Sequence, residues 1–165
     1  MKIFFVSLML ACATLAVNAQ QLNNIDRITA AYIGVKNALV ASNGNLAKGR
    51  SKELESVLAV PTTGLTALQQ KIMTAYLGKI KADSHLISQT NAIDAQRRHF
   101  TNLSANMYKL VSGLKVNSAT LYQQYCPMKK AAWLSETEDI RNPYYGDKML
   151  ECGEVTATLK PVSAK

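Results

Sequence analysis

The sequence predicts a mainly α protein: an antiparallel up-down four-helix bundle, followed by a C-terminal loop-rich segment with one or two short strands. Two observations predict the bundle. Apolar residues recur at helical spacing up to about residue 116, and turn residues interrupt them at short intervals. A third observation predicts the change of structure. Beyond residue 116 the helical periodicity stops, and cysteine, methionine and aromatic residues gather instead.

Residues 1–19 have the pattern of a secretory signal peptide. Lys2 supplies a positive charge, an apolar run follows, and small residues end at Ala19. Cleavage there leaves a chain with a net charge of +7, which we expect to be exported and periplasmic. Lipidation at Cys12 is disfavoured because a poor lipidation motif precedes it. No later stretch approaches the roughly 20 apolar residues of a membrane span, so we expect no transmembrane span in the mature chain.

Each of the four expected helices carries an apolar face, with successive members mostly three or four residues apart. Such faces have to pack on one another, because an isolated helix is only marginally stable in water. The four faces are Ile25, Ile28, Tyr32, Val35 and Leu39; Leu54, Val57 and Leu58; Leu65, Leu68, Ile72, Tyr76, Ile80 and Ile87; and Ile93, Phe100, Leu103, Met107, Leu110 and Leu114.

Turn and capping residues indicate where these helices begin and end. We expect the second helix over about residues 46–59. Thr62 or Thr63 is expected to cap the third helix, and Asn91 with Asp94 resembles a capping pair for the fourth.

The segment 117–165 is expected to pack on the helical bundle of residues 20–116, so that the two form one domain. Two stretches in it, residues 121–125 and 154–159, are predicted as strands because they are rich in aromatic or β-branched residues.

Four sulfur-bearing residues of this segment form the candidate site: Cys126, Met128, Met149 and Cys152. Thiolate and thioether ligands select soft ions, so the pattern favours Cu(I) or Ag(I) over zinc. The alternative is a structural disulfide between the two cysteines, which an oxidising compartment favours. Both interpretations require the cysteines to lie close together. Trp133 is expected either to fill space between the segment and the bundle or to cap a bound ion.

Other functional classes have weaker support. His85 and His99 lie alone on predicted helices, and the chain has no phosphate-binding loop, nucleophile elbow or zinc-protease spacing, so we expect no enzymatic activity. The basic residues are scattered without an aromatic ladder, so no nucleic-acid partner is expected. The positive charge instead favours an acidic partner or an anionic surface.

Three blocks of the sequence resemble a known family, the domain of unknown function 3347. They are YCPMKKAAWLS at 125–135, IRNPYYG followed by MLECG over 140–153, and QRRHFTNLS at 96–104. The resemblance covers roughly residues 30–159.

The resemblance implies a role in handling soft metals. Similar domains occur as small exported proteins, and others are fused to the periplasmic adaptor subunits of copper and silver efflux pumps. The expected function is therefore that of a periplasmic Cu(I) or Ag(I) binding protein, an accessory or chaperone to heavy-metal efflux. Its partner would be an efflux adaptor or a copper-transporting membrane protein. The alternative is a disulfide-stapled structural or interaction module without metal.

Overall fold

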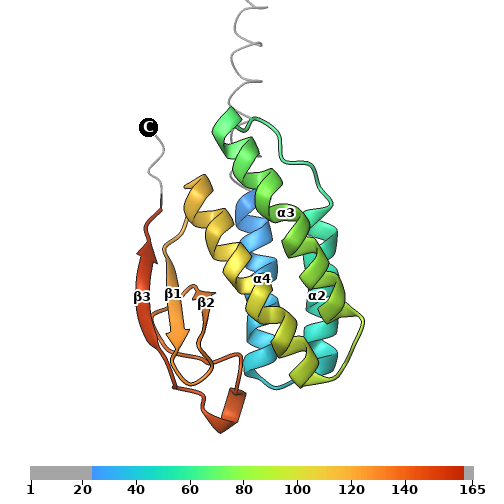
Figure 1. The fold of residues 1–165 in the computed structure, drawn as a ribbon, viewed down its shortest axis with the longest axis vertical. Helices are drawn as coiled ribbons and strands as arrows, with labels where there is room; N and C mark the ends of the chain where they lie inside the picture. The colour runs from blue at the N-terminus through green and yellow to red at the C-terminus, as the bar shows by residue number, and fades with distance from the viewer. Residues whose placement is uncertain (1–23, 162–165) are drawn as a thin grey trace, which may run out of the picture.

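The computed structural model describes residues 24–161, and within them the chain is mainly helical, with four helices and a small three-stranded antiparallel sheet (Figure 1). The predicted signal peptide and Cys12 lie outside the described residues. The mainly helical prediction is confirmed. No helix in the described part is long and apolar enough to cross a bilayer.

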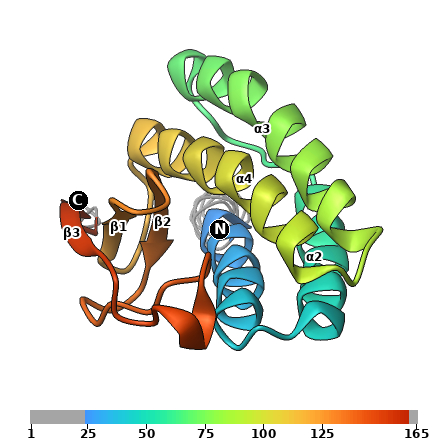
Figure 2. The same cartoon turned by 60° about the horizontal axis from the view of Figure 1, so that its bottom comes forward.

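The first helix, described over residues 24–40, lies between the sheet and the second helix, and the fourth helix also contacts the sheet (Figure 2). Its predicted apolar face is fully buried: Ile25, Ile28, Tyr32, Val35 and Leu39 are each at most 1% exposed. This helix therefore forms the centre of the core, and helices and sheet share one hydrophobic cluster.

Helix α2 (Gly44–Leu58) follows after a short turn. Asn43 is its N-cap, because its side chain accepts the backbone N–H of Leu46 at 2.9 Å. The helix thus begins two residues earlier than the sequence predicted and ends one residue earlier. Leu54 and Leu58 of its predicted face are buried.

Helix α3 (Ala67–Ser88) begins at a different cap from the predicted one. Thr66 is the N-cap and forms a capping box with Gln69, so the prediction of Thr62 or Thr63 is wrong. The first turns of α3 extend beyond the core, and Leu68 is 69% exposed although it was placed on the apolar face. Periodicity marks a helical face but not where the neighbouring helix ends.

Helix α4 (Ile93–Leu114) packs along α3 and carries the best-buried face after the first helix. Phe100, Leu103, Met107 and Leu110 are 0% exposed, so Met107 is a core residue as expected. The predicted Asn91 capping pair is wrong: Ala92 occupies the cap position and makes no side-chain hydrogen bond.

The sheet has the strand order β2-β1-β3, with β1 (Leu121–Cys126), β2 (Ala131–Ser135) and β3 (Glu154–Leu159). The first and last strands are the predicted ones, whereas β2 is an addition to the one or two strands expected. Its sequence AAWLS shows no apolar alternation, since it is buried on nearly every position. It becomes a strand because the four-residue turn after Cys126 folds it back onto β1, pairing Cys126 with Ala131.

The sheet docks on the bundle through β2 and the first helix. The Tyr32 hydroxyl accepts the backbone N–H of Leu134 at 3.0 Å and lies 2.6 Å from the Ser104 hydroxyl of α4. The rings of Tyr32, Phe100 and Tyr144 follow one another at centroid distances of 5.5 and 5.7 Å, and Trp133 meets Tyr144 edge-on at 6.0 Å. This aromatic row joins helices, strand and loop into one core.

Candidate functional site

Cys126 and Cys152 lie side by side, with their sulfur atoms 3.4 Å apart. Both are free thiols. Cys126 ends β1 and is completely buried, and Cys152 lies just before β3 and is partly exposed. The antiparallel pairing of β1 with β3 brings these ends together across 26 positions of sequence. The predicted close approach of the two cysteines is therefore confirmed.

The two thiols are electrostatically unequal. Burial by itself raises the pKa of Cys126, but hydrogen bonds from the Lys129 backbone, the Cys152 thiol, the Asn142 side chain and the Met128 backbone reverse this, and the net pKa is lowered. The pKa of Cys152 is raised, first because it donates its hydrogen to Cys126 and second because of burial. Cys126 is thus the thiol that ionises more easily.

Asn142 holds the loop that carries Cys152. Its side-chain amide donates to the Cys152 carbonyl at 2.8 Å, and its side-chain oxygen accepts the backbone N–H groups of Tyr144 and Tyr145 at 2.8 and 3.3 Å. Its own backbone N–H donates to Leu150 at 2.8 Å. Asn142 is completely buried, so these hydrogen bonds satisfy its side-chain amide and oxygen in place of water.

Arg97 of α4 fastens the same loop to the bundle. Its guanidinium donates to the carbonyls of Pro143 at 2.9 Å and Leu39 at 3.2 Å, and to the Ser42 hydroxyl at 2.9 Å. Gly146 lies directly against this group at a φ of 56°, where a Cβ would come within 2.8 Å of the Arg97 guanidinium. Any side chain at this position would push the loop away from the bundle.

Trp133 lies behind the thiol pair rather than in solvent. It is 1% exposed, and a Cβ on Gly153 would come within 2.9 Å of its ring. Gly153 directly follows Cys152, so the indole ring supports the backbone at the partly exposed thiol. This contact agrees with the space-filling role expected for Trp133, while its role as a cap over an ion stays a prediction.

The two predicted methionine ligands have different surroundings. Met128 sits in the turn after Cys126 and is 66% exposed, whereas Met149 is partly buried in the loop before Cys152. The cysteine pair is thus brought together by the backbone, while participation of the two thioethers stays a prediction. Among residues 24–161, no group of three or more His, Cys, Asp and Glu side chains is placed to hold a metal ion.

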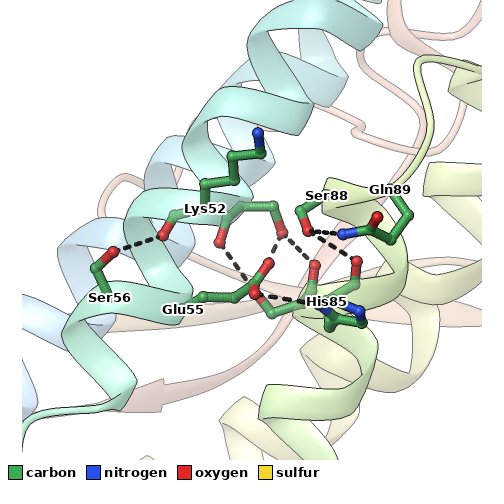
Figure 3. A network of polar contacts seen from close by, with 8 residues as sticks. Lys52, Glu55, Ser56, His85, Ser88 and Gln89 are labelled. Atoms are coloured by element: carbon green, nitrogen blue, oxygen red, sulfur yellow. Dashed lines mark hydrogen bonds and ion pairs between the residues drawn. The ribbon is translucent and has the colours of Figure 1, made fainter.

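The histidines lie elsewhere in the fold. His85 is on α3, where its Nδ1 is 3.3 Å from the Glu55 carboxylate of α2 (Figure 3). The adjacent hydroxyls of Ser51 and Ser84 donate to each other's backbone carbonyl at 2.8 and 3.1 Å. This polar network joins α2 to α3, and neither of these helices carries a thiol.

Sequence reasoning missed Arg97 as a support of the site. The sequence predicts Asn142 and Pro143 as turn and packing residues that position Met149 and Cys152, and the hydrogen bonds of Asn142 agree with this. Arg97, by contrast, belongs to the basic residues that the sequence analysis treats as scattered. The position of Arg97 in the sequence could have revealed its role. It falls between Ile93 and Phe100, near the apolar face of α4, where a charged residue needs buried partners.

The comparisons with known proteins identify a family without a known activity. Neither the curated proteins nor the solved structures include a match to this chain. A family model described as "Protein of unknown function (DUF3347)" matches residues 28–119, which is more than half of the chain. The match covers the helical region and ends before the two sequence blocks at 125–135 and 140–153. The family model therefore supports the wider resemblance, out to residue 159, only in its helical part. The chain belongs to the DUF3347 family.

Proposed function

We propose that this protein binds one monovalent soft ion, Cu(I) or Ag(I), through Cys126 and Cys152. The observation that carries the proposal is the sulfur–sulfur distance of 3.4 Å between two free thiols. With metal–thiolate bonds of ~2.3 Å, a two-coordinate ion would hold the sulfur atoms ~4.6 Å apart. The thiols would need to separate by about 1.2 Å, which a side-chain rotation at the partly exposed Cys152 could supply.

The surroundings of Cys126 support a thiolate ligand. Only the thiolate binds metal, and several N–H groups already point at this sulfur. Met128 and Met149 flank the two thiols in sequence and would add soft, uncharged donors that disfavour zinc. Met128 would have to turn inward from its exposed position to do so.

In its cellular setting, we propose an exported, non-enzymatic accessory or chaperone to heavy-metal efflux. An efflux adaptor or a copper-transporting membrane protein would be its partner. Pull-downs from envelope extracts, with and without copper, test this part. Failure to recover any transport component in either condition would contradict it.

The ligands are tested by titrating the reduced protein with Cu(I) against a competing chelator without oxygen. Changing both Cys126 and Cys152 to serine should weaken binding by more than ~100-fold, because even the outer partners of metal ligands are worth 10–100-fold. Met128→Leu and Met149→Leu should each weaken it by up to about tenfold. Met107→Leu, which removes a thioether from the bundle core, is the matched control and should leave the affinity unchanged.

The second candidate function is a disulfide-stapled structural module, and the same sulfur distance favours it. Oxidation would close a loop between Cys126 and Cys152, worth roughly 3–4 kcal/mol in the chain-entropy model. Counting free thiols on protein taken directly from the periplasm separates the two candidates. Equal Cu(I) binding by the wild type and the double-serine variant would exclude the proposed thiol site.

A further inference from the structure

A second feature lies against the loop that carries Cys152: a groove with four cationic side chains. Its cavity volume is about 390 Å³, and it is lined by Asp94, Arg97, Arg98, Lys129, Tyr144, Tyr145 and Lys148. The cations come from three separate segments, namely α4, the turn between β1 and β2, and the short helix η1 (Gly146–Lys148). One carboxylate, that of Asp94, faces them in the groove.

Arg97 gives this groove a positive charge whose ion-pair partner, Asp94, is largely exposed to solvent. The residue is 8% exposed, and the acceptors of its hydrogen bonds are two carbonyls and a hydroxyl, all neutral. The Asp94 carboxylate is 3.9 Å away on a side chain that is 85% exposed, and Asp147 acts on Arg97 at longer range. A buried charge is stabilised by a close counter-charge, which an anionic ligand in the groove would provide.

We propose that this groove binds the carboxylates of an acidic peptide segment on a partner protein. The cations are distributed over three segments, which suits a ligand with several carboxylates spaced along a chain better than one small anion. A cavity of this size is in the range of pockets that bind side chains or small ligands. A flat membrane surface could not enter it. The backbone of Lys129 hydrogen-bonds to the Cys126 sulfur, so a segment bound at Lys129 would lie near the thiol pair.

This inference goes beyond metal binding and is tested on reduced, metal-free protein. The probe is a fluorescently labelled hexaglutamate peptide, titrated by anisotropy at low ionic strength. The groove variant changes Arg98, Lys129 and Lys148 to glutamine and keeps the structurally bonded Arg97. The matched control changes Lys71, Lys79 and Lys81, three exposed lysines of α3, to glutamine. These substitutions lower the net charge by the same amount as those in the groove variant.

The groove variant should bind the peptide about tenfold more weakly than the wild type, whereas the α3 variant should lie within about twofold of it. Raising the salt concentration to 0.5 M should remove most of the difference. Equal losses in the two variants would show attraction to net charge alone and overturn the proposal. Displacement of the peptide by inorganic phosphate at equal concentration would also overturn it, because the groove would then be a small-anion site.

Discussion

The helical bundle and the cysteine-bearing tail are stabilised in different ways. In the bundle, most of the buried side chains are apolar, as Leu103, Leu110 and Ile80 are, and Gln96 is a buried amide that connects the carbonyls of residues 44, 87 and 90. In the tail, a few buried polar side chains each connect several backbone groups. Gln124 donates to three successive carbonyls at residues 137–139, and Asn117 donates to those of residues 119, 159 and 160.

This difference indicates how each region should respond to change. Loss of one apolar contact in the bundle is shared among many neighbours, whereas loss of one polar connector in the tail releases a whole loop. The family match follows the same division, because it covers the helices and not the strands or the thiol pair. The following changes test the comparison in order of decreasing effect.

The largest effect is expected from Asn142→Ala. It removes the hydrogen bonds to the backbone groups of Cys152, Tyr144 and Tyr145, of which that of Tyr144 is buried and the other two partly buried, at a cost of about 2–4 kcal/mol in local stability. Cys126 is fully buried, so its alkylation requires local opening, and its rate should rise at least tenfold. Mass spectrometry of the alkylated peptides measures the rate, and circular dichroism follows the helices, which should persist.

The matched control is Asn106→Ala, because Asn106 is an exposed residue of α4 with a single hydrogen bond to Asn102. It should leave the alkylation rate within about twofold of the wild type. If Asn142→Ala unfolds the helices together with the tail, the stability of the tail does not depend on this polar residue separately from that of the bundle.

An intermediate effect is expected from Gly153→Ala. The new methyl group would come within 2.9 Å of the buried Trp133 ring and 3.1 Å of the Tyr125 carbonyl, and such overpacking costs about 1–3 kcal/mol. Urea unfolding measures the loss. Gly49→Ala in α2 is the control in the bundle: nothing lies within 4 Å of the added carbon, so the variant should gain about 0.5–1 kcal/mol. Equal stability of the two variants would show that the backbone at Cys152 is not closely packed.

The smallest effect is the loss of stability at alkaline pH that the buried tyrosines of the aromatic row should cause. Burial raises the pKa of Tyr32, against the lowering effect of its hydrogen bonds to Ser104 and Leu134, and burial also raises that of Tyr144. A raised pKa in the folded state means that the stabilisation is complete below the unfolded value of about 10 and is lost as pH rises above it. At pH 11 each tyrosine should lower the free energy of unfolding by about 1.4 kcal/mol.

Urea unfolding between pH 8 and 11 checks this effect. Tyr32→Phe should reduce the loss of stability over that range by about 1.4 kcal/mol. Ser104→Ala is the control, because it removes a hydrogen bond and keeps the Tyr32 hydroxyl, so its pH dependence should stay close to that of the wild type. An unchanged slope in Tyr32→Phe would contradict the assignment to this tyrosine.

Local sequence determined the helices and two of the three strands. The three-to-four spacing of apolar residues such as Ile28, Tyr32 and Val35 is a consequence of helix geometry, so it can be read without knowledge of neighbours. The helix caps were harder to predict from the sequence. Thr66, rather than Thr62 or Thr63, is the N-cap of α3. Several threonines offer the same hydroxyl group, and the surrounding structure selects one of them. For β2, pairing with β1 decides what its composition does not.

The candidate site shows the same division. The sequence by itself determined which residues carry sulfur, and it led to the expectation that Cys126 and Cys152 lie close together because a disulfide and a shared ion both require it. Tertiary structure alone decided that one thiol is buried and the other partly exposed, and that Arg97 of α4 holds the loop between them. The physical reason is that a hydrogen bond depends on the position of an atom in space, and residues distant in sequence, such as Arg97 and Pro143, acquire that position only when the chain has folded.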